Sequence, residues 1–90
     1  MKTQRGFALR KLGDEYILIG ESADLVDFNK MVTLNESAAY LWRRAEQESS
    51  ISADLFAIWL QEEYEVGAQQ ALADASAIIQ SWLSAGIITE

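Results

Sequence analysis

The stretch KMVTLNESAAYLW, residues 30–42, changes from a strand-like to a helix-like pattern within a few residues. Its first part, Lys30–Leu34, is a short run of mostly strand-forming residues, and its second part spaces apolar residues as on one face of a helix. Asn35 lies at the changeover, and asparagine is well suited to accept a hydrogen bond from an unpaired N–H of a first helical turn. We therefore predict a strand that ends before an Asn35 N-cap and a helix over residues 36–47.

The residues before this stretch predict a β-hairpin. Residues 6–20, GFALRKLGDEYILIG, hold two strand-like runs separated by Gly13-Asp14, a glycine-first pair that suits a tight turn. The second run, Tyr16–Ile19, is apolar on both faces, although a strand of a small sheet normally buries only one. Either the segment at 21–29 or a partner is expected to cover its outer face.

The residues after this stretch predict two more helices. Ser52 is a suitable N-cap for a helix that ends near Tyr64. A third helix ends before Gly86, which suits the left-handed position after a helix. Its apolar residues follow a 3.6-residue period: Ala71, Leu72, Ala75, Ile78, Ile79, Trp82 and Leu83.

The whole pattern is β-β-β-α-α-α, an α+β fold that we expect to form one domain over residues 1–90. The three tryptophans, Trp42, Trp59 and Trp82, fall one per predicted helix on its apolar face. We expect them to fill a common core, the alternative being that one of them borders a ligand groove. Ile87 and Ile88 are expected to fold back onto the same core.

Composition excludes most catalytic chemistry. The chain has no histidine and no cysteine, so thiolate nucleophiles, imidazole bases and zinc sites of those residues are absent. Asp24 and Asp27 resemble a metal-binding loop only faintly, because the glycine and terminal glutamate of a calcium loop are missing. We expect neither an enzyme nor a metal or other cofactor. No apolar run approaches the ~18–20 residues that span a bilayer, and we expect a cytoplasmic protein without a membrane partner.

Charge divides the chain into two unlike parts. The first 44 residues hold all seven lysines and arginines and six acids, whereas residues 45–90 hold eight acids and no base. A nucleic-acid-binding surface needs cations that contact phosphates. The second part therefore offers no such surface, and we expect no nucleic-acid partner.

Several spaced motifs resemble the PqqD family over nearly the whole chain. They are GFALRKLGDEYILI, VDFNKMVTLNESAAYLW, EEYEV and the terminal WLSAGIITE. The most specific residues are Asp27-Phe28-Asn29, Met31, Leu34-Asn35-Glu36 and Leu41-Trp42, supported by Gly6-Phe7 and Ala85-Gly86-Ile87.

This resemblance implies a winged helix-turn-helix-like fold, with a three-stranded antiparallel sheet followed by three helices. It also implies a recognition element for ribosomally made, post-translationally modified peptides (RiPPs). Such an element binds the leader of a precursor peptide as an added strand and presents it to a modifying enzyme, often a radical SAM protein, as in the synthesis of pyrroloquinoline quinone (PQQ). The groove implied for this chain lies between the third strand and the outward face of the third helix. Its residues would be Lys30, Met31, Val32, Thr33, Leu34, Gln69, Ala73, Asp74, Ser76, Ala77 and Gln80.

Two other interpretations remain open at this point. The same fold could serve as a winged-helix interaction module, either a structural adaptor between proteins or a DNA-binding regulator. An exposed edge strand could also pair with a second copy of the chain and form a homodimer.

We predict that the chain does not bind duplex DNA at physiological salt, because residues 45–90 carry acids and no base. An anisotropy titration with mixed-sequence duplexes measures this directly. Saturation below about 1 μM that weakens steeply with added salt, as counterion release requires, would contradict the prediction.

Overall fold

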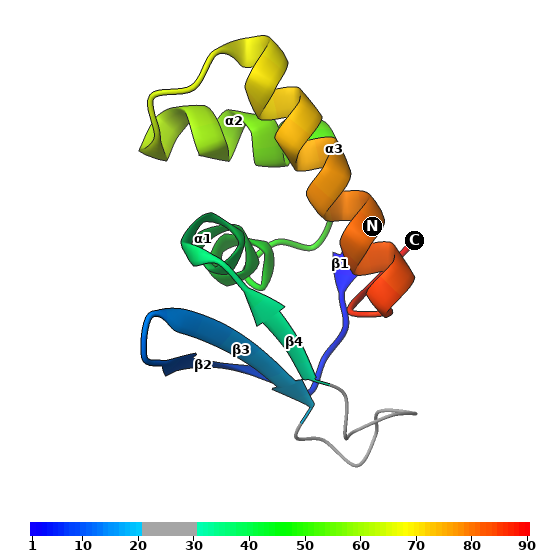
Figure 1. Ribbon diagram of the computed structural model, residues 1–90. Coiled ribbons are helices and arrows are strands. Elements are labelled where there is room, and N and C mark those ends of the chain that lie inside the picture. The colour runs from blue at the N-terminus through cyan, green and yellow to red at the C-terminus, as the bar shows by residue number, and fades with distance from the viewer. Residues whose placement is uncertain (21–30) are drawn as a thin grey trace.

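The computed structural model describes residues 1–20 and 31–90 and shows a three-stranded sheet packed against three helices (Figure 1). The sheet is antiparallel with the order β2-β3-β4, and its strands are β2 (Phe7–Leu12), β3 (Glu15–Gly20) and β4 (Met31–Leu34). The helices are α1 (Glu36–Ala45), α2 (Ala53–Glu63) and α3 (Ala68–Ala85). This arrangement confirms the predicted α+β, winged-helix-like fold. Within the described residues, no helical segment combines the length and the apolar character that crossing a bilayer would need.

The predicted hairpin is confirmed, and its turn lies at Gly13-Asp14. Gly13 has φ of +64°, a conformation that glycine adopts without the steric cost of a side chain. In β3, Leu18 is fully buried, and its neighbours Ile17 and Ile19 therefore face the other side of the sheet, where they are half-buried. The segment expected to cover this outer face lies outside the described residues.

Strand β4 alternates in the same way. Leu34 is buried and Val32 half-buried on the inner face, whereas Met31 and Thr33 are exposed. The register pairs Met31 with Ile19 of β3, which places both on the outer face. Lys30, predicted as the first residue of this strand, lies outside the described residues.

The junction between β4 and α1 is capped as predicted. The Asn35 side-chain oxygen accepts a hydrogen bond from the Ala38 N–H at 2.8 Å and another from the Ser37 hydroxyl at 3.1 Å. The helix ends at Ala45, two residues before the predicted end at Gln47. The N–H groups of Gln47 and Glu48 bond to the carbonyls of Arg44 and Ala45, only three residues back, which tightens the chain and ends the α-helical pattern.

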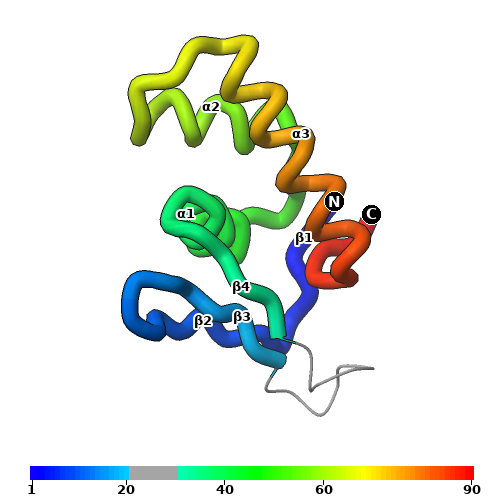
Figure 2. The backbone as a smooth tube through the Cα atoms, viewed as in Figure 1, coloured from blue at the N-terminus to red at the C-terminus, as the bar shows by residue number. Residues whose placement is uncertain are grey.

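Two very short strands were not predicted. Strand β1 (Lys2–Thr3) pairs antiparallel with β5 (Ile88–Thr89), so the two ends of the chain lie side by side (Figures 1 and 2). Gly86, with φ of +76°, turns the chain back after α3 as expected. Ile87 and Ile88 are almost completely buried, which confirms that they fold back onto the core.

Aromatic rings connect the sheet to all three helices. Trp42 of α1 packs edge-to-face against Phe7 of β2, with ring centroids 6.2 Å apart, and against Trp82 of α3 at 5.5 Å. Phe56 of α2 lies 5.4 Å from both Trp82 and Trp59. The prediction that the three tryptophans share one core is confirmed, since each is at most 3% exposed.

We predict that Asn35→Ala lowers the free energy of unfolding by about 0.5–2 kcal/mol, because it removes the oxygen that accepts the Ala38 N–H. The urea midpoint should fall while the slope stays the same. Asn35→Ser is the control, because serine caps helices about as well as asparagine and should preserve most of the midpoint. An alanine variant as stable as the parent would show that this hydrogen bond does not contribute to stability.

Candidate functional site

Strand β4 lies at an edge of the three-stranded sheet. It pairs with β3 on one side, and no other described strand pairs with its second side. An edge of this kind presents backbone N–H and C=O groups that a further extended chain can bind.

A cavity of about 260 Å³ lies between this strand and α3. Its walls combine the end of β4 and the start of α1 with one face of α3. The lining residues are Val32, Thr33, Leu34, Asn35, Ala38, Ala77, Ile78, Ser81 and Trp82. Trp82 thus belongs both to the core and to the wall of this cavity.

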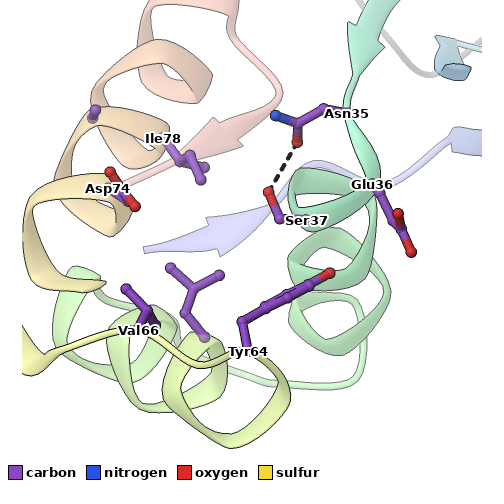
Figure 3. Close-up of a pocket in the computed structure, with 9 residues that line it drawn as sticks. Asn35, Glu36, Ser37, Tyr64, Val66, Asp74 and Ile78 are labelled. Atoms are coloured by element: carbon purple, nitrogen blue, oxygen red, sulfur yellow. Dashed lines mark hydrogen bonds between the residues drawn. The ribbon is translucent and has the colours of Figure 1, made fainter. Parts of the chain in front are cut away.

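A larger cavity of about 670 Å³ continues from the same place, since it shares Asn35, Ala77 and Ile78 with the smaller one. Figure 3 shows Asp74 and Ile78 of α3 across from Asn35 and Ser37, with Tyr64 and Val66 closing the side toward α2. Glu36 and Leu60 complete its lining. We call the two cavities together the β4–α3 groove.

The surface of the groove is more apolar than polar, with polar residues interspersed along its lining. Val32 and Ile78 are half-buried, and the small side chain of Ala77 is exposed in both cavities. The charged residues of the lining are two acids, Glu36 and Asp74. A strand edge beside an apolar groove is suited to hold an extended peptide. Backbone hydrogen bonds position the peptide, and its alternate side chains enter the groove.

The structure brings part of the predicted site together. Val32, Thr33, Leu34, Asp74 and Ala77 all line the groove.

The other predicted residues lie elsewhere. Met31 is 62% exposed and faces the outer side of the sheet, and Lys30 lies outside the described residues. On α3, four predicted residues are exposed but line neither cavity: Gln69, Ala73, Ser76 and Gln80.

Sequence reasoning left open whether a tryptophan borders the groove, as Trp82 does, and it missed two other groove residues of α3, Ile78 and Ser81. They share a helix face with Asp74 and Ala77, since these four positions follow the i, i+3, i+4 and i+7 spacing. Ile78 was assigned wholly to the core stripe, yet it is half-buried at the border of that stripe. Two features of the sequence indicate that Ile78 can line the groove: it lies at the edge of the apolar stripe, and it follows the small Ala77.

Comparisons with known proteins show which family and which fold this chain shares. The sequence model of the family described as coenzyme PQQ synthesis protein D (PqqD) matches residues 15–88. No curated protein matches the chain at a significant level.

Two solved structures share the fold. TbiB1 in complex with the TbiA(beta) leader peptide has a TM-score of 0.73 at 14% identity, and the match covers 97% of this chain and 93% of that one. Lasso peptide synthetase B1 complexed with the leader peptide has a TM-score of 0.70 at 21% identity, with 99% and 96% covered.

Proposed function

The chain belongs to the PqqD family, and from this premise we propose that it binds the leader segment of a ribosomally made precursor peptide and presents it to a modifying enzyme. The leader would add as a strand to the edge of β4 with which no described strand pairs, and would lie against α3. The observation that carries this proposal is the apolar groove that runs along that edge. The two solved structures that share the fold were both determined with leader peptides bound, which supports leader binding as the function.

Strand addition alone would give only weak binding. Four or so backbone hydrogen bonds contribute a net ~1 kcal/mol each, and ordering a flexible peptide costs several kcal/mol. Micromolar affinity requires about 8 kcal/mol. Burying two or three apolar leader side chains, at roughly 1.5–3 kcal/mol each, would supply the difference. The groove offers suitable surface for them at Val32, Ala77 and Ile78.

In this binding mode, backbone hydrogen bonds would set the register of the peptide, and its side chains would determine specificity. Backbone groups are the same in every peptide, so the edge of β4 would position a leader without identifying it. The side chains that enter the groove would distinguish one leader from another. The protein then acts as a binding module, and the chemistry belongs to the enzyme that receives the peptide. Following the family resemblance, we propose a radical SAM enzyme as this partner.

We predict that Ala77→Arg weakens leader binding at least about tenfold, because a long side chain at Ala77 would occupy both cavities. The measurement is a titration with the leader peptides encoded beside the gene. Ala73→Arg is the matched control: it adds the same side chain to an exposed alanine of α3 that lines neither cavity. It should bind within about twofold of the parent.

Amide NMR shifts on addition of the leader should cluster at residues 31–37 and 74–82, around the groove. Shifts centred on the Gly13-Asp14 turn or on α2 would place the peptide elsewhere. Equal binding by Ala77→Arg and the parent would likewise contradict the groove assignment.

A further inference from the structure

The larger cavity begins where β4 ends. The smaller cavity runs beside Val32, Thr33 and Leu34, whereas the larger one contacts the chain only from Asn35 onward. A peptide paired along β4 therefore enters the larger cavity with the residues that adjoin its paired segment. Those residues are bound by side-chain contacts rather than by a strand edge.

The lining of this cavity combines an aliphatic surface with two acidic residues, Asp74 and Glu36, which we call the acidic rim. Leu60, Val66 and Ile78 provide aliphatic surface. Asp74 projects into the space from α3, and Glu36 lies on the opposite side, at the start of α1 (Figure 3). Neither acid forms a salt bridge with a described base.

Among the described residues, the bases that follow Glu36 in the chain, Arg43 and Arg44, are engaged elsewhere. Arg44 forms a salt bridge with Glu62 at 2.7 Å, and Arg43 lies over the Tyr16 ring at 5.1 Å. Residues 45–90, which supply α2 and α3, contain no base at all. The Asp74 carboxylate accepts one hydrogen bond, from the Gln70 side chain at 2.8 Å. A carboxylate has room for further donors.

Tyr64 lines the same cavity and lies in the same negatively charged environment. Its hydroxyl pKa is raised, first by burial and then by the negative charge of Glu36, with smaller effects from Glu63 and neighbouring tyrosines. The ring is oriented by an edge-to-face contact with Tyr40, with centroids 6.0 Å apart. Aromatic rings and carboxylates both attract cations.

We infer that the larger cavity selects a lysine or arginine side chain of the leader, at the position adjoining the segment paired with β4. The aliphatic stem of such a side chain covers Leu60, Val66 and Ile78, and its charged end reaches the acidic rim. An acidic residue at that position is repelled by Asp74 and Glu36. This inference rests on the proposed function, since it names the chemistry of the peptide that the groove binds.

The test uses a phage-displayed library of random peptides, selected separately on four forms of the protein. They are the parent, the double variant Glu36→Gln/Asp74→Asn, Ala77→Arg and the control Ala73→Arg. The double variant removes both rim charges with little change of shape. Asp74→Asn alone is selected as a fifth form, so the question stays answerable if Glu36→Gln disturbs the start of α1.

The parent and the Ala73→Arg control should enrich peptides with an apolar strand-like segment and a basic residue at a constant distance from it. Peptides selected on the double variant or on Asp74→Asn should keep the apolar segment and lose the basic residue. In binding assays, replacing that residue by leucine should weaken binding to the parent about twofold to fivefold at low salt, and less at high salt. The same replacement should leave the double variant nearly unchanged.

The outcomes separate the inference from the function on which it rests. If the parent enriches no related peptides, or if Ala77→Arg enriches the same ones, the proposed function is wrong and the inference falls with it. The parent could also enrich related peptides that Ala77→Arg does not bind but that carry no basic residue at a constant position. In that case the inference alone is wrong. Persistence of the basic residue in peptides selected on both the double variant and Asp74→Asn contradicts it as well.

Discussion

The packing of Trp42 against rings from two other elements is the contact on which the rest of the structure depends. Trp42 is fully buried between Phe7 of β2 and Trp82 of α3, and Trp82 in turn contacts Phe56 of α2. Close-packed rings leave little freedom for one element to move against another. The separation of α3 from the sheet, and with it the width of the β4–α3 groove, follows from this aromatic contact.

The Asn35 cap fixes the position at which the strand-edge part of the site ends. It ends β4 and starts α1 at a defined residue, because its side chain satisfies an N–H that the first turn leaves unpaired. The same residue lines both cavities, so the point where the strand edge stops is also the point where the larger cavity begins. One polar side chain thus separates the part of the groove suited to backbone pairing from the part suited to a side chain.

The elements of the fold were largely predictable, and the face of α3 that borders the groove was not. Apolar spacing predicted α3 and its buried stripe correctly. The predicted groove residues Ala73 and Gln80 are nevertheless exposed outside the groove, and Ile78 lines it instead. A 3.6-residue period defines which residues share a face, but the rotation of that face toward β4 depends on how α3 packs against the other elements.

The sequence by itself determined the features that depend on neighbouring residues: the Gly13-Asp14 turn, the Asn35 and Ser52 caps, and the end of α3 at Gly86. Each of these depends on contacts within about four residues, which a local pattern records. Tertiary structure alone decided the pairing of β1 with β5 and which residues of α3 meet β4 across the groove. Both involve segments that are distant in the chain, and two-residue strands carry no periodic signal. Only the packing of the shared core brings such segments together.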